Sequence, residues 1–300
     1  MRRALSRVGI TLALCLGSVV AAGGGAEAKQ YGAWQPATAV TPVNDPANDG
    51  CPIESPDGLS LYIMSQRGSG GDQDIWVATR DSLDQPFSAP TELPAPVNSS
   101  ANDFCPTPLP GHRLLLVSNR GGTDAYGTTA CGGGDMYMTR YSKATGSWLE
   151  PWNLGCVGDG GPNGPGVEYG PSLVETAAGT QLYYSTGPAI GGGGQEIVVS
   201  QLGSDGSFGP PVAVEQLNSA VDDVMPNVRK DGLEVVFAST RGGGGFDIWT
   251  STRTSVFQPW SPPVPVEAVN TAAPETRPSL SRDGSRLYFG RAGEIYASTR

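Results

Sequence analysis

Short apolar runs and glycine-rich turns alternate along this chain. Between Pro226 and Asn270 the apolar runs fall at 226–229, 234–239 and 247–252, and a fourth follows Trp260. The runs are rich in β-branched and aromatic residues, whereas Gly, Asp, Pro and Ser gather between them. This pattern predicts a unit of four short antiparallel strands. No segment of ten or more residues after position 28 shows a capped helical period, so we expect almost no helix.

The four-strand unit recurs along the chain. A proline opens each copy, with spacings of 54, 65, 55 and 52 residues, at Pro52, Pro106, Pro171, Pro226 and Pro278. Repeats near fifty residues that carry several strands are typical of propeller blades. We therefore predict an all-β, five-bladed β-propeller of four-stranded antiparallel blades. The predicted blades span about 50–100, 101–165, 166–220, 221–272 and 273–300.

The last unit ends at Arg300, after its third strand. Its missing strand is predicted near the other end of the chain, because WQPATAVTPVN (34–44) matches WSPPVPVEAVN (260–270) in its Trp, Pro and Val-Asn positions. A strand within residues 29–49 would then complete the last blade and remove the open sheet edges.

The glycine runs are turns of the repeat. The run 242–245 lacks the Lys and the following helix of a phosphate-binding loop, and glycine loops recur in the other units. The stretches PIESPDGLSLYIMSQRGSGGDQDIWVATR and RPSLSRDGSRLYFGRAGEIYASTR resemble the PD40 repeats, the WD40-like units of TolB-type β-propellers. The resemblance implies a propeller fold and an exported binding or scaffold protein. TolB's own ring is similar to a six-bladed one, whereas five units are present here.

Residues 1–28 have the arginines, the apolar stretch and the Ala26-Glu27-Ala28 pattern of a secretory signal peptide. Cleavage is expected before Lys29, leaving residues 29–300 as one exported domain, periplasmic or released. A lipid anchor on Cys15 is the alternative. No later segment is apolar enough to span a membrane.

The formal charge of −10 disfavours nucleic acid and suits cations, basic partners or neutral sugars. A role of the charge in solubility alone is the other interpretation. The single histidine, His112, excludes Ser-His-Asp chemistry and multi-histidine metal sites. No cofactor is predicted, although a divalent cation among the acids is an alternative.

A carboxylate lies three residues before each opening proline, which predicts a ring around one mouth of the central channel: Asp49, Asp103, Glu168, Asp223 and Glu275. The glycine loops bring three arginines to the same face, Arg67, Arg120 and Arg241, and a second acidic series starts the third strands, Asp74, Asp135, Glu196, Asp247 and Glu294. The ring is predicted to bind a ligand. The alternative is structural, with acids paired to arginines or capping turns. Gly187 and Ala292 occupy the arginine position in two units, so Glu168 and Glu275 are expected to be unpaired.

Four cysteines follow the signal segment, and export favours disulfides. Cys51 and Cys105 precede neighbouring opening prolines and are predicted to form one bridge; Cys131 and Cys156 are predicted to form the other. Most tryptophans recur at blade positions and are expected to pack between sheets, whereas Trp148 and Trp152 depart from the pattern.

These features predict an exported, monomeric binding module that recognises a cell-envelope protein, a cation or a saccharide at its acidic channel mouth. One alternative is a carboxylate-dependent glycoside hydrolase on the same face, by analogy with other five-bladed propellers. Another is a scaffold without a ligand.

Overall fold

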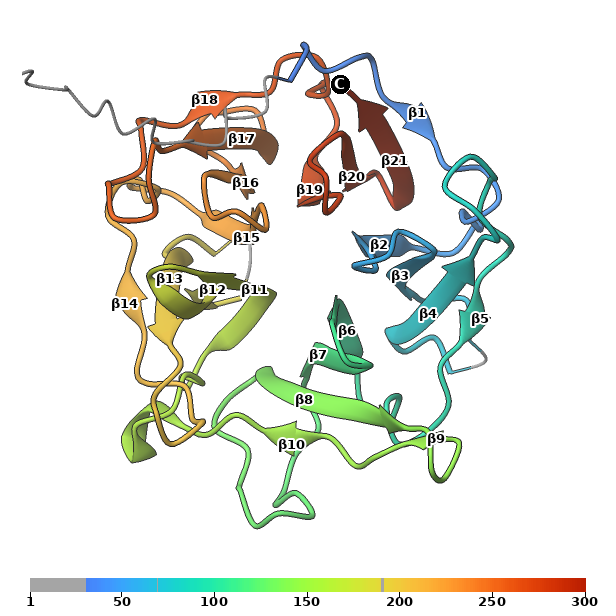
Figure 1. Ribbon diagram of the computed structural model, residues 1–300, viewed down its shortest axis with the longest axis vertical. Coiled ribbons are helices and arrows are strands. Elements are labelled where there is room, and N and C mark those ends of the chain that lie inside the picture. The colour runs from blue at the N-terminus through green and yellow to red at the C-terminus, as the bar shows by residue number, and fades with distance from the viewer. Residues whose placement is uncertain (1–30, 69, 190–191) are drawn as a thin grey trace, which may run out of the picture. The chain divides into compact units, whose positions relative to one another are not determined.

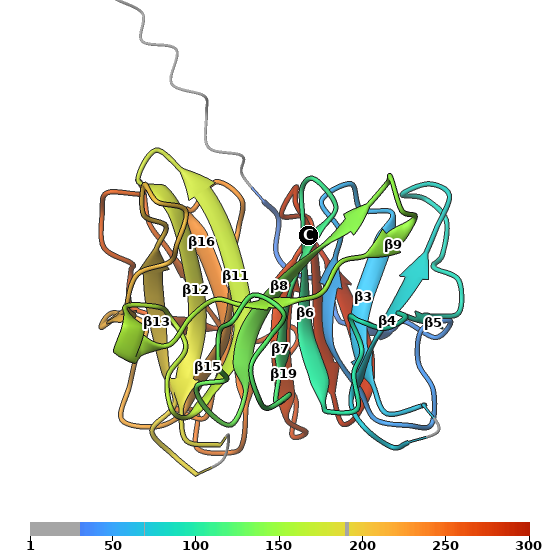
Figure 2. The same ribbon diagram turned by 90° about the horizontal axis from the view of Figure 1, so that it is seen from below.

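Five antiparallel sheets surround a central axis, which confirms the predicted propeller (Figure 1). The computed structural model describes residues 31–68, 70–189 and 192–300, so the predicted signal peptide lies outside the described residues. Residues 32–300 form one unit. In side view the strands run between the two faces of the ring (Figure 2).

The blades follow one another along the chain. Blade 1 contains β2 (Asp49–Glu54), β3 (Ser60–Ser65), β4 (Asp74–Thr79) and β5 (Thr91–Glu92); blade 2 contains β6 (Asp103–Leu109), β7 (Arg113–Ser118), β8 (Asp135–Ser142), β9 (Ser147–Trp148) and β10 (Trp152–Asn153). Blade 3 contains β11 (Val167–Thr176), β12 (Gly179–Gly187), β13 (Glu196–Gln201) and β14 (Val212–Ala213); blade 4 contains β15 (Asp223–Val228), β16 (Glu234–Ser239), β17 (Asp247–Thr252) and β18 (Val264–Pro265). Blade 5 contains β19 (Glu275–Leu280), β20 (Arg286–Arg291) and β21 (Glu294–Thr299).

The N-terminal strand β1 (Thr38–Ala39) completes blade 5, as predicted. It pairs antiparallel with β21, with Thr38 opposite Ala297 and Ala39 opposite Tyr296. The innermost strand of each blade contacts its counterparts in the next blades, so β2, β6, β11, β15 and β19 form a closed inner ring.

The core lies between neighbouring sheets. Between blades 3 and 4, for example, Val174 and Tyr183 pack with Phe237 and Trp260 in one buried cluster. Trp260 is 5% exposed, which confirms the predicted packing role for this repeated tryptophan. Such clusters join each blade to its neighbours, because one sheet cannot bury its apolar faces alone.

Helix is almost absent, as expected. A three-residue 3₁₀ turn, η1 (Val157–Asp159), is the one helical element in the described ranges. The search of those residues for a helix long and apolar enough to cross a membrane finds none.

Candidate functional site

The predicted ring of carboxylates is internal. All five side chains lie at the start of an innermost strand, and their residues are between 0% and 2% exposed. Each carboxylate accepts a hydrogen bond from the backbone N–H four residues earlier, donated by Asp45, Ser99, Gly164, Ser219 and Thr271 respectively. The acids therefore fasten the loop that leads from one blade into the next.

Arginines pair with four of the five acids. The Arg67–Asp49 and Arg120–Asp103 ion pairs measure 2.7 and 2.5 Å, and Arg241 pairs with Asp223. The same arginines donate to loop carbonyl oxygens, of Val43, Val97 and Leu217. These contacts agree with the alternative interpretation, in which the ring acids pair with arginines and stabilise the loops.

The expectation that Glu275 is unpaired is wrong. Arg291 Nε lies 2.7 Å from Glu275 Oε1, and Arg291 is the direct cross-strand partner of Glu275. Blade 5 joins β20 to β21 by a turn of only two residues, Ala292 and Gly293. Because no long glycine loop is present, its arginine lies within β20, one residue before the aligned position.

Glu168 has no arginine partner, as expected. Its Oε1 accepts hydrogen bonds from Thr186 Oγ1 at 2.8 Å and from Gly164 N at 3.0 Å, while Oε2 has no partner. Burial raises the pKa of Glu168 to about 7. This carboxyl is completely buried, so it is a desolvated acid without direct access to solvent.

The second acidic series is not uniform. Asp135 accepts hydrogen bonds from the backbone of Cys131 and Gly132 and therefore caps its loop. Asp74 lies at the equivalent position, where burial and then the charges of Glu92 and Asp103 raise its pKa to about 6. The described residues contain no cluster of three or more His, Cys, Asp or Glu side chains able to hold a metal ion.

An asparagine clamp that was not predicted from the sequence repeats in every blade. In blade 1, Asn98 Oδ1 accepts from Ile75 N at 2.9 Å, and Asn98 Nδ2 donates to Ile75 O at 3.1 Å. The other clamps join Asn44 to Ile295, Asn163 to Met136, Asn218 to Ile197, and Asn270 to Ile248. Each asparagine lies five residues before a ring carboxylate, a spacing that was visible in the sequence.

One of the two predicted disulfides is formed. Cys131 and Cys156 are bonded and join the long loop of blade 2 to the segment after β10. The predicted Cys51–Cys105 bridge is not formed, because the two residues are free thiols with their sulfur atoms in a 2.7 Å hydrogen bond. The hydrogen bond with Cys105 and burial raise the pKa of the Cys51 thiol.

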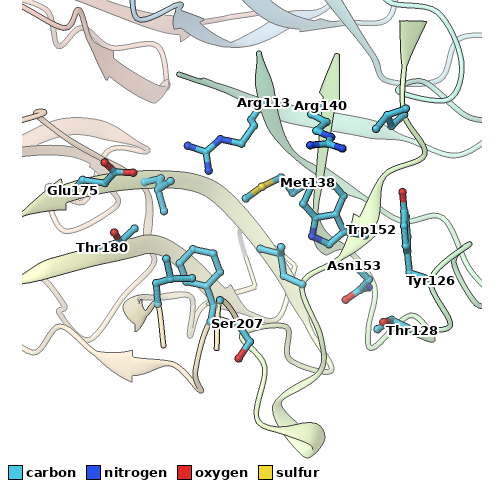
Figure 3. A pocket seen from close by; sticks show the side chains of 16 residues that line it. Arg113, Tyr126, Thr128, Met138, Arg140, Trp152, Asn153, Glu175, Thr180 and Ser207 are labelled. Carbon is cyan, nitrogen blue, oxygen red and sulfur yellow. The ribbon is translucent and has the colours of Figure 1, made fainter. Parts of the chain in front are cut away.

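A cleft opens between blades 2 and 3 (Figure 3). Its volume of about 720 Å³ is in the range of small-molecule and peptide-side-chain sites. The apolar lining comes from both blades: Met138, Leu149, Trp152, Leu154, Leu173, Leu202 and Phe208. Tyr126, in the loop that enlarges the second unit, packs edge-to-face on Trp152 at 6.2 Å between ring centroids.

Arg140, at the edge of this cleft, differs from its counterparts in other blades. At the end of the third strand, Arg80, Arg253 and Arg300 each lie 4.1–4.3 Å from the centroid of an aromatic ring. Each also donates its Nε–H to a glycine carbonyl oxygen in the first turn of its blade, at Gly58, Gly232 and Gly284.

Arg140 is exposed and makes no such contact in the described part of the chain. The reason is strand length. The third strands of blades 1, 4 and 5 end at the threonine before the arginine, whereas β8 continues to Ser142 and pairs with β9. Arg140 is therefore held within β8, directly opposite Arg113 in β7. Two like charges at opposed positions destabilise a sheet.

The fold and this geometry define the class: a five-bladed β-propeller with a ligand-sized cleft between two blades. No family model and no curated protein matches the chain. Among solved structures, an α-L-arabinofuranosidase from Lactobacillus brevis is 12% identical, with a TM-score of 0.57, over 87% of this chain and 94% of that one.

Two further structures are similar. The catalytic domain of the Coprinopsis cinerea GH62 α-L-arabinofuranosidase is 14% identical, with a TM-score of 0.56, over 90% of this chain and 97% of that one. The putative TolB from Agrobacterium tumefaciens is 15% identical, with a TM-score of 0.48, over 87% and 79%. At these identities the likeness concerns the fold alone, so membership of the PD40 family stays a prediction.

Proposed function

We propose that this protein is an exported binding module that uses the cleft between blades 2 and 3 to hold an apolar, acidic segment of a cell-envelope protein. The observation that carries the proposal is the pair of opposed arginines, half-buried Arg113 and exposed Arg140, beside an apolar floor. In three other blades the counterpart of Arg140 contacts an aromatic ring and a glycine carbonyl oxygen of its own protein. Arg140 makes no such contact in the described residues, so its guanidinium can contact a ligand. A carboxylate on the ligand would relieve the repulsion between the two guanidinium groups.

The cleft lining favours an apolar side chain over a sugar. Aliphatic groups from Leu149, Leu154, Leu173 and Leu202 make up much of its surface. Sugars require many hydrogen-bonding partners, and burying their hydroxyl groups against aliphatic carbon costs free energy. Trp152 and Tyr126 supply the aromatic contact area that is enriched in protein interfaces.

Binding at the acidic channel mouth stays a separate prediction. Four of its carboxylates are held by arginines and the fifth is buried, so a ligand there would have to compete with internal contacts. This cost is why we place the proposed site at the cleft.

The test uses residues 29–300 and an array of twelve-residue peptides that differ in leucine content and in net charge. The parent should retain peptides that combine leucine with Asp or Glu, and the double variant Arg113→Gln/Arg140→Gln should bind them at least about tenfold more weakly, the usual loss for a charge-assisted hydrogen bond. Arg282→Gln, which removes an exposed arginine elsewhere, is the matched control. Equal binding by parent and double variant, or no preference among peptides, would contradict the proposal.

A glycoside hydrolase is the second candidate, favoured by one observation. Glu168 is a desolvated carboxyl with a raised pKa, the property required of a general acid in these enzymes. Its complete burial opposes the role, because a general acid must reach the glycosidic oxygen. Hydrolysis of aryl α-L-arabinofuranosides by the parent and its loss in Glu168→Gln would favour the enzyme over the binding module.

A further inference from the structure

The residue before each opening proline occupies a special position on the inner strands. These residues are Cys51, Cys105, Gly170, Met225 and Arg277, with φ values of 50°, 46°, 61°, 54° and 47°. Four of the five therefore hold an L side chain in the left-handed region, at a β-bulge where the strand register shifts. A backbone feature shared by all five blades places these residues around the axis.

Their side chains meet inside the ring. The sulfur atoms of Cys51 and Cys105 are in hydrogen-bond contact, and a Cβ on Gly170 would lie only 2.6 Å from both Arg277 Nη1 and the Cα of Met225. Gly170 thus leaves space that the guanidinium of Arg277 occupies. Arg277 extends from blade 5 across the axis to blades 2 and 3.

Arg277 is a buried charge without a counter-charge. The residue is 0% exposed, and no carboxylate in the described chain lies within ion-pair distance of it, unlike the arginines of the carboxylate ring. Nη2 donates to Thr107 Oγ1 at 3.1 Å and to Pro171 O at 3.4 Å, whereas Nε and Nη1 have no partner. An arginine keeps its charge when buried, and an unpaired buried charge strongly destabilises the folded state.

No neighbouring group in the described ranges makes a hydrogen bond or an ion pair with the free nitrogens of Arg277. Against the effect of burial, the hydrogen bond with Cys51 and the charge of Arg277 lower the pKa of the Cys105 thiol. Neither thiol accepts a hydrogen bond from Arg277, since the sulfur atoms bond to each other. Asp49, the nearby acid, already holds Arg67 and the backbone N–H of Asp45.

Arg277 is one of the residues that line a pocket of about 150 Å³, together with Asp49, Cys51, Met225, Thr276 and Arg291 among others. Its size exceeds that of one ordered water molecule and is small for a large organic anion. Asp49 in this lining is paired with Arg67, and Arg291 is paired with Glu275. Among the described residues of the lining, Arg277 is therefore the charge without a counter-charge, and one unpaired positive charge favours a single negative charge. We propose that this pocket binds a monovalent anion of halide size, such as chloride, on Arg277 at the centre of the ring.

The bound anion would stabilise the folded ring, because the unfolded chain has no such site. The first experiment measures the Tm of residues 29–300 at pH 7 in sodium gluconate and in sodium chloride of equal ionic strength. At ten times the dissociation constant, chloride should raise the Tm of the parent by about 4 °C. Arg277→Met should show no chloride dependence, whereas Arg282→Met should respond as the parent does.

The second experiment does not depend on a variant that folds. Crystals of the parent grown in sodium bromide should show an anomalous scattering peak in the pocket beside Arg277. Equal Tm values in gluconate and chloride, together with no bromide peak, would overturn the proposal. A chloride response that appears only in Cys51→Ser/Cys105→Ser would also overturn it, because the counter-charge in the parent would then be a thiolate.

Discussion

The repeated polar residues of this propeller hydrogen-bond to loops and strands within the protein. The ring carboxylates and the asparagine clamps make the same kinds of contact in successive blades. Glu168 is the exception with the greatest physical consequence. It lacks the arginine found beside the other four acids and is buried as completely as they are.

Glu168 should make stability depend on pH. In the unfolded chain this carboxyl has its ordinary pKa of 4.5, whereas burial raises the pKa in the folded protein to about 7. Between these values the folded state binds more protons, so its contribution to the free energy of unfolding falls as pH rises and is constant above pH 7. The loss should be about 3 kcal/mol, which urea unfolding at pH 4.5 to 8 would measure.

Glu168→Gln removes this titration, so its stability relative to the parent should rise across the same interval. Glu196→Gln, an exposed acid on β13, is the matched control and should follow the parent. Parallel pH profiles for the parent and Glu168→Gln would show that this carboxyl does not titrate as proposed.

At the scale of elements, blade 2 departs most from the repeat. Its third strand, β8, runs past the usual end, and the outer strand is divided into β9 and β10. The disulfide Cys131–Cys156 holds the resulting loops beside η1 and the cleft. The cleft therefore results from the lengths of strands and loops in one blade.

Removing this disulfide should destabilise the fold. Cys131→Ser/Cys156→Ser should lower the free energy of unfolding by about 3 kcal/mol, because the cross-link restricts a loop of 25 residues in the unfolded chain. Urea unfolding of the parent and the double variant measures the difference. The parent treated with a reductant should match the variant, whereas unchanged stability in both would contradict the expectation.

Sequence pattern predicted the strands, the blade number and the closing strand, because each depends on apolar alternation that repeats five times. It could not predict the cleft, since the extension of β8 past Arg140 depends on pairing with β9 and leaves no local signal. Aligning the units by their glycine loops put Ala292 at the arginine position, so the pairing of Arg291 with Glu275 was not predicted. A two-residue turn replaces the glycine loop in blade 5 and shifts the arginine by one residue. The longer second unit and the departure of Trp148 and Trp152 from the repeat pattern indicated only that blade 2 is irregular.

At the scale of the molecule, the ring depends on the pairing of its two ends. β1 covers β21, Asn44 clamps Ile295, and Trp34 stacks on Arg300 at 4.2 Å. Without these contacts β21 would present an open edge to other molecules.

A chain that begins at Asp45 should therefore lose at least about 3 kcal/mol in free energy of unfolding, the cost of deleting a large packed aromatic side chain. It should also self-associate, as light scattering after size-exclusion chromatography would reveal. A chain that begins at Gly32 retains β1 and is the control. A shortened chain as stable and as monodisperse as this control would contradict a closing role for β1.

The position of β1 also sets an order of events during synthesis. Residues 38–39 leave the ribosome before any of the five blades is complete, whereas their partners, Tyr296 and Ala297, follow the first four blades. The ring cannot close before these residues are made, so one sheet stays incomplete until residue 297 is present.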